Sequence, residues 1–221
     1  MRRPWSHIVV DWLGLSSFTA MSSVVGVRIV EAVSGWAHAW FWPVAIGLGY
    51  LLADFGSGVV HWAGDRYGNA KTPFFGPALI GPFRNHHSDP RDICRHGLLE
   101  LLGNSGLVVL PFLLVAARVA HWPLFGATTA GILLIACVAA VATNLFHRWA
   151  HLDRIPGLIR WLQSVRLVLP PEEHERHHSG ARDRAYCITT GWMNPLLEKI
   201  DFWNRMEKLI RKTTGMRPTP G

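Results

Sequence analysis

The chain has 221 residues, of which 49% are hydrophobic and only 17% are charged, whereas soluble proteins carry about 25% charged residues. This length suits one domain with a full core and excludes two large ones. Its net charge is +7, and beside long apolar runs such a charge favours anionic lipid headgroups over nucleic acid as the partner. The three cysteines form no C-x-x-C motif, which argues against a disulfide framework or a thiolate zinc site.

Four apolar stretches are each near the length of about 20 residues that a helix needs to cross a bilayer. They run over residues 9–27, 40–60, 98–117 and 124–146. The start of the chain lacks the succession of regions that marks a signal peptide, so no removable leader is expected. The sequence therefore predicts an all-α fold, in which residues 1–221 form a single polytopic membrane domain with about four transmembrane helices.

Positive charge is distributed unevenly among the segments outside these stretches. The links 28–39 and 118–123 carry one basic residue each, whereas the start of the chain, the loop 61–97 and the tail 147–221 carry all the other Lys and Arg. Because segments rich in Lys and Arg stay in the cytosol, we expect both termini, the loop and the tail on the cytosolic side.

Nine of the twelve histidines fall on that same side, at or beyond the ends of the apolar stretches. They are His61, His86, His87, His96, His147, His151, His174, His177 and His178. His147 and His151 are four residues apart, as are His174 and His178, so the members of each pair point to the same side of a helix. Imidazole suits iron, copper, nickel and zinc, and one zinc needs only three or four ligands. The pattern predicts a dinuclear metal centre in a cytosolic histidine-rich cap; a merely hydrogen-bonded polar cap is the alternative.

Polar residues inside or beside the apolar stretches extend the same pattern. Asp54 lies two helical turns before His61. Glu100 and Asn104 lie four and eight residues after His96, and Asn144 lies three residues before His147. Carboxylates and amides are costly inside a membrane, and metal-bound histidines need acceptors for their second ring N–H. These four side chains are therefore expected to bind metal or to support a ligand, with hydrogen bonding between helices as the alternative.

Six blocks of the sequence resemble the plasmanylethanolamine desaturase family. They are ADFGSGVVHWAGDRYG (53–68), GPFRNHHSDP (81–90), CRH (94–96), TNLFHRWAH (143–151), HERHH (174–178) and YCITTGWMNPLLEKIDFW (186–203). The resemblance implies an O2-dependent di-iron membrane enzyme that converts 1-O-alkyl phospholipids to the vinyl ethers of plasmalogens. The family is similar in turn to the plant chloroplast desaturase that introduces a trans bond into phosphatidylglycerol, so a trans acyl-chain desaturase is the alternative.

The resemblance also implies ligands and partners. The family's histidines carry over onto the same nine positions, and two iron ions are the implied cofactor. Where membrane desaturases commonly have a second histidine, this chain has Asp65, four residues after His61, so Asp65 either binds iron or orients a ligand. The cofactor carries the hard step of breaking C–H bonds, so no catalytic residue beyond the metal centre is expected. No nucleotide-binding glycine motif is evident, and the electrons are therefore expected from a separate cytochrome b5-like or ferredoxin-like protein.

The segment His174–His178 also satisfies the H-E-x-x-H pattern of zinc metalloproteases. In such a protease Glu175 would be the general base, whereas a di-iron site would use all three histidines of the segment. The segment follows Pro170–Pro171 and is surrounded by charged residues, so it cannot lie in the middle of a span, and we interpret the match as coincidental. A metal transporter is a further alternative, but its ligands should lie near the bilayer midplane. A structural adaptor would leave the histidines unexplained.

Overall fold

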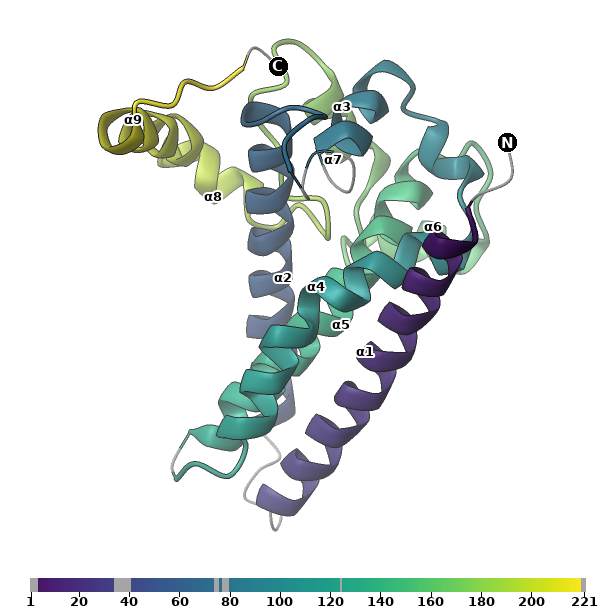
Figure 1. The fold of residues 1–221 in the computed structure, drawn as a ribbon, viewed down its shortest axis with the longest axis vertical. Coiled ribbons are helices and arrows are strands. Elements are labelled where there is room, and N and C mark those ends of the chain that lie inside the picture. Colours follow the sequence, from purple (N-terminus) through teal and green to yellow (C-terminus); the bar gives the residue numbers. More distant parts are fainter. Residues whose placement is uncertain (1–3, 34–40, 74–75, 77–79, 124, 220–221) are drawn as a thin grey trace. The chain divides into compact units, whose positions relative to one another are not determined.

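The computed structural model describes residues 4–33, 41–73, 76, 80–123 and 125–219. Within these ranges the chain is helical and has no strand, so the predicted all-α class is confirmed (Figure 1). The elements are α1 (Trp5–Ala32), α2 (Phe41–Arg66), α3 (Gly81–Ser88), η3 (Asp92–Arg95), α4 (Leu98–Val119), α5 (Gly126–Ala150), α6 (Gly157–Ser164), α7 (Pro171–His178), α8 (Asn194–Lys199) and α9 (Phe202–Thr214).

Among the described residues, four helices are long and apolar enough to cross a membrane, namely α1, α2, α4 and α5. The stretches 9–27 and 98–117 lie wholly within α1 and α4. Helix α2 begins at residue 41 and α5 at residue 126, one and two residues after the predicted starts, and residues 40 and 124 lie outside the described ranges. Helix α2 continues past the second stretch to Arg66, and α5 continues past the fourth to Ala150. Backbone hydrogen bonds extend a helix whether or not its residues are apolar, so both helices carry polar side chains beyond their apolar parts.

The chain forms two compact units, each built from two segments. The first contains Met1–Ala53 and His96–Leu145, and the second contains Asp54–Arg95 and Phe146–Gly221. The boundary falls within α2 and within α5, so each of these helices contributes to both units. The single domain expected over residues 1–221 stays a prediction.

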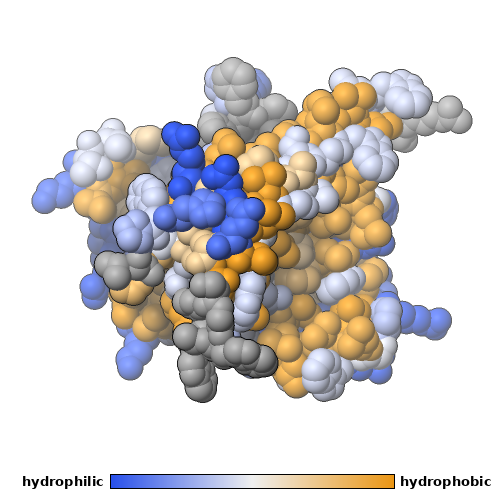
Figure 2. All heavy atoms as spheres, turned by 90° about the horizontal axis from the view of Figure 1, so that it is seen from below, coloured by the Kyte–Doolittle hydropathy of each residue, from blue (hydrophilic) through white to orange (hydrophobic). Residues whose placement is uncertain are grey.

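In the first unit, α1 and α4 pack backbone against backbone through glycines. A Cβ atom at Gly103 would lie 2.5 Å from the Cα of Asp11, and one at Gly106 would lie 2.6 Å from the carbonyl oxygen of Gly14. Such close approach through small residues is typical of membrane helices, whose association depends on van der Waals packing. Large apolar side chains remain exposed on the same two helices, for example Val30 and Val108. Apolar residues also cover much of the face drawn in Figure 2.

In the second unit, short helices surround the polar ends of α2 and α5. Helix α7 begins at Pro171, whose fixed φ suits the first helical position, and Glu172 and Glu173 place negative charge in its first turn. Helices α8 and α9 pack on a buried aromatic cluster that includes Trp62, Tyr186 and Trp203. This packing anchors the segment after α7 and leaves the polar side of α7 for the histidines.

Candidate metal centre

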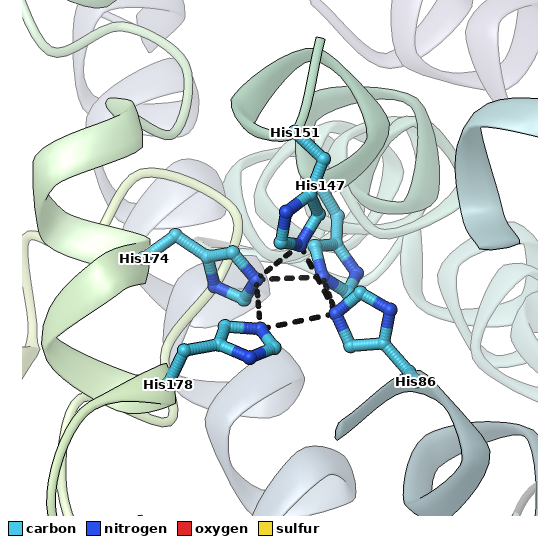
Figure 3. A group of neighbouring side chains, drawn as sticks. All are labelled: His86, His147, His151, His174 and His178. Carbon is cyan, nitrogen blue, oxygen red and sulfur yellow. Dashed lines mark hydrogen bonds between the residues drawn. The ribbon is translucent and has the colours of Figure 1, made fainter. Parts of the chain in front are cut away.

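Five histidines of the second unit converge on one point, as Figure 3 shows. His86 comes from α3, His147 from α5, His151 directly follows α5, and His174 and His178 come from α7. Their neighbouring Nε2 atoms lie 2.8–3.1 Å apart. The four-residue spacing at the end of α5 and within α7 brings the two members of each pair to one side, which is the arrangement expected from the sequence. We call this set the five-histidine group.

Hydrogen bonds alone do not satisfy this group. The Nε2 atom of His174 lies 2.8 Å from that of His147, 2.8 Å from that of His151 and 2.9 Å from that of His178. Each imidazole nitrogen offers either one N–H or one lone pair, so one nitrogen cannot pair with three others. Two nitrogens about 2.1 Å from one metal ion and at a right angle would lie about 3.0 Å apart. The spacing of the nitrogens therefore fits a shared metal ion.

Burial keeps these imidazoles neutral. Burial, with the neighbouring histidines second, lowers the pKa of His86 to about 2 and that of His178 to about 3. The pKa of His151 falls to about 4, chiefly through burial and then through Arg91. For the fully buried His174, burial and the surrounding histidines hold the pKa well below its ordinary value. Neutral imidazole is the form that binds metal, so these side chains are ready ligands at neutral pH.

A second group, which we call the Asp65 group, contains His61, Asp65, His87 and His177. The Oδ2 atom of Asp65 lies 3.3 Å from His61 Nε2, 3.5 Å from His87 Nε2 and 3.3 Å from His177 Nε2. The Nε2 atoms of His87 and His177 are 3.0 Å apart. Asp65 is buried, yet among the described residues neither of its carboxylate oxygens has a hydrogen-bond partner, and neither does His61 Nε2. A buried carboxylate without partners is costly, and a cation among these four donors would compensate it.

Two backbone carbonyls orient the rings of this second group. His61 Nδ1 lies 3.2 Å from the Tyr186 carbonyl oxygen, and His177 Nδ1 lies 2.8 Å from that of Arg184. Because a carbonyl oxygen only accepts, Nδ1 carries the proton in both rings and donates it. The proton-free Nε2 atoms then face Asp65, which is the tautomer that a metal ligand needs. Sequence reasoning missed this role of Tyr186 and Arg184, since a carbonyl leaves no mark on residue type.

Five further residues predicted at the site belong to neither group. His96, Glu100, Asn104 and Asn144 are in the first unit, whereas Asp54 is in the second. His96 Nδ1 lies 3.5 Å from Glu100 Oε1, and Asn104 is exposed. Asn144 Nδ2 donates to the Leu101 carbonyl at 3.1 Å and to Ser105 Oγ at 3.1 Å, so it joins α5 to α4. Direct roles at a metal stay predictions for these five.

The fold and the two donor groups define a class: a polytopic membrane protein with buried histidine sites able to hold metal ions. A lipid desaturase domain model matches residues 50–220. The chain is 42% identical over 207 residues to a plasmanylethanolamine desaturase of Myxococcus xanthus, covering 90% of this chain and 72% of that protein. It is 36% identical to plasmanylethanolamine desaturase 1 of Mus musculus, covering 83% and 70% of the two chains.

A chloroplastic fatty acid desaturase 4-like 2 of Arabidopsis thaliana is 32% identical, covering 99% of this chain and 76% of that protein. No solved structure matches the chain. The chain therefore belongs to the lipid desaturase family, as its sequence blocks indicated. It is an integral membrane oxidoreductase that desaturates lipids. The prediction of an enzyme is confirmed, and the adaptor, transporter and protease alternatives are not supported.

Proposed function

We propose that this desaturase forms the vinyl ether of plasmalogens from 1-O-alkyl phospholipids, with two iron ions and O2. The observation that carries the proposal is the pair of donor groups, five histidines in one and three histidines with Asp65 in the other. Nitrogen donors with one carboxylate suit iron, and two groups suit two ions. The choice of an ether substrate is supported by the relatives at 42% and 36% identity, which both bear the name plasmanylethanolamine desaturase.

In this proposal the five-histidine group holds one iron and the Asp65 group holds the other. Asp65 is a direct ligand, because its Oδ2 lies within 3.3–3.5 Å of three imidazole nitrogens and both its oxygens lack other partners. When bound, the irons together with O2 supply the oxidising power that takes two hydrogens from adjacent chain carbons. Six of the nine donors are buried and the other three are half-buried, and such burial keeps water from the reaction.

The electron balance requires an external donor. Forming one double bond releases two electrons and two protons, whereas reducing O2 to two waters consumes four of each, so two electrons and two protons must come from elsewhere. We propose that a cytochrome b5-like or ferredoxin-like protein supplies the electrons from the cytosolic side. The cytosolic placement of the termini and of both donor groups rests on the unequal distribution of Lys and Arg.

The test is expression in cells that lack plasmalogens but are supplied with an alkyl-ether phospholipid. Lipid mass spectrometry should then show an acid-labile product two hydrogens lighter than the substrate. Cells expressing the His174→Ala variant, which removes a donor of the five-histidine group, serve as the matched control and should show none. A new trans double bond in an ester-linked chain, without any vinyl ether, would move the substrate to phosphatidylglycerol. The absence of both products, with protein present in the membrane, would refute the proposal.

A further inference from the structure

Asp54 is a fully buried acid on α2 that the candidate metal centre does not use directly. Its Oδ1 atom accepts three backbone N–H groups, from Thr189 at 3.2 Å, Thr190 at 2.7 Å and Gly191 at 2.9 Å. Its Oδ2 atom accepts the N–H of Met193 at 2.9 Å. Successive backbone N–H groups that converge in this way form a nest for an anion. Here the anion is a side chain of the protein itself.

This nest gives the loop between α7 and α8 a single conformation. Gly191 has a φ of +80°, a left-handed conformation that glycine adopts without steric cost. Ser57, one turn after Asp54, accepts the N–H of Ile188 at 3.0 Å and donates to the Asp54 carbonyl oxygen at 2.7 Å. Five backbone N–H groups of the loop are thus held by two side chains of α2. A buried carboxylate is tolerated when such donors surround it.

The held loop is continuous with the carbonyls that orient metal ligands. Asn194 accepts the N–H of Cys187 at 2.9 Å and donates to its carbonyl oxygen at 3.1 Å, so the two ends of the loop are tied together. Asn194 also donates to Glu173 Oε1 of α7 at 3.0 Å. The residue before Cys187 is Tyr186, whose carbonyl receives the Nδ1 proton of His61. The conformation that Asp54 imposes therefore reaches a ring of the Asp65 group through the backbone.

We propose that Asp54 is a positioning residue for the Asp65 group, acting through the loop 186–194 and without touching a ligand ring. Seven residues separate Asp54 from His61 on α2, close to two full turns, so both project from the same side of one rigid helix. The helix sets the position of His61, and the loop held by Asp54 sets the direction of its ring. Loss of the Asp54 carboxylate should release the loop and weaken the Asp65 group before the five-histidine group.

The test compares wild type, Asp54→Asn and Gln163→Ala as purified full-length enzymes. The asparagine amide has the size of the carboxylate but places an NH2 group against backbone N–H donors. Gln163 is also buried in the second unit and donates to the Leu169 carbonyl at 3.2 Å, outside the loop 186–194. It therefore controls for the general loss of a buried polar group.

Two measurements are made, and neither needs turnover. Anaerobic titration with Fe²⁺ followed by metal analysis should show two ions in wild type and Gln163→Ala, with the second ion bound about 10–100-fold more weakly in Asp54→Asn. Hydrogen exchange in the metal-free protein should be at least about tenfold faster at residues 189–193 of that variant. Unchanged affinity for the second ion, or an equal loss in Gln163→Ala, would overturn the role of Asp54.

The inference rests on the proposed two-metal centre, and the same titration separates the two. Binding of fewer than two ions by wild type would contradict the two-metal centre itself. Binding of two ions by wild type, with the same affinity for the second ion in Asp54→Asn, would contradict only the positioning role. If Asp54→Asn loses its helical circular dichroism, Ser57→Ala decides, because it removes one tie at Ile188 and keeps the carboxylate. It should weaken the second ion by less than about tenfold, yet measurably. No change in Ser57→Ala would then overturn the inference.

Discussion

Two substitutions on α7, Glu175→Gln and His177→Ala, separate the desaturase interpretation of HERHH from the zinc-protease one. Successive residues of a helix are turned by about 100°, so His174, His177 and His178 share one side of α7 while Glu175 lies on another. Glu175 is exposed, whereas His177 is fully buried with its Nε2 3.3 Å from the Asp65 carboxylate. In a zinc protease, Glu175 would be required for catalysis and His177 would not, whereas the desaturase interpretation requires His177 and not Glu175.

The structure sets the size of each effect. Glu175→Gln changes an exposed side chain, so the free energy of unfolding should move by no more than about 0.5 kcal/mol, or about twofold in an equilibrium constant. His177→Ala removes one of the four donors of the Asp65 group and takes from the Arg184 carbonyl its donor at 2.8 Å. The lost hydrogen bond costs about 0.5–1.5 kcal/mol, and the cavity left by the buried ring adds to that cost.

The assay measures vinyl-ether product, bound iron and thermal unfolding for each purified variant. Glu175→Gln should retain product formation within about twofold of wild type and bind two irons. His177→Ala should form no product and bind about one iron, because the five-histidine group is left intact. The reasoning fails if Glu175→Gln is inactive with its metal retained while His177→Ala stays active, since that pair of results is the signature of a zinc protease.

Three further outcomes are expected. Cysteines placed at Asn69 and Thr213 should be protected from an impermeant reagent outside intact cells, and one at Gly35, which lies outside the described residues, should react; the reverse pattern would contradict the cytosolic placement. Gly103→Ala should cost about 1–3 kcal/mol of stability in detergent because its Cβ would lie 2.5 Å from a Cα atom of α1. Gly26→Ala, whose Cβ would meet nothing within 4 Å, is its control, and equal effects would refute the packing argument. Removing the metal with a chelator should lower the midpoint of thermal unfolding, since an ion that binds only the folded chain stabilises it; an unchanged midpoint would argue against the two metal sites.

The spanning helices and the pairing of histidines four residues apart were predictable, because local periodicity carries that information. An apolar stretch of sufficient length forms a spanning helix by satisfying its own backbone. About four such helices were expected, and the described part of the chain contains four. Likewise, a spacing of four residues places His147 with His151 and His174 with His178 on common sides whatever the rest of the chain does. These properties depend on residues within one or two turns of each other, which a sequence displays directly.

The division of the histidines into two groups came only from the tertiary structure. His86 and His87 are adjacent in the chain yet belong to different groups, and so do His177 and His178. Neighbouring residues of a helix diverge by about 100°, so the group that each histidine joins depends on which side chains the other helices bring alongside. The surroundings of Asp65 likewise came only from the fold, which places three imidazole nitrogens 3.3–3.5 Å from its Oδ2. Its direct binding of a metal stays a prediction.

The polar residues near the spans show the limit most clearly. From the sequence alone, Asp54 and Asn144 were equally good candidates for supporting a metal ligand. Asp54 lies seven residues before one histidine and Asn144 lies three residues before another. In the fold, Asn144 joins α5 to α4, while Asp54 holds the backbone of residues 189–193. Helical periodicity determines the side on which a residue projects, and the sequence contains that much. The hydrogen-bond partners of the Asp54 carboxylate are backbone N–H groups more than a hundred residues away in the chain. Nearly every residue type offers the same N–H and C=O, so residue type does not reveal such partners and only the folded chain decides them.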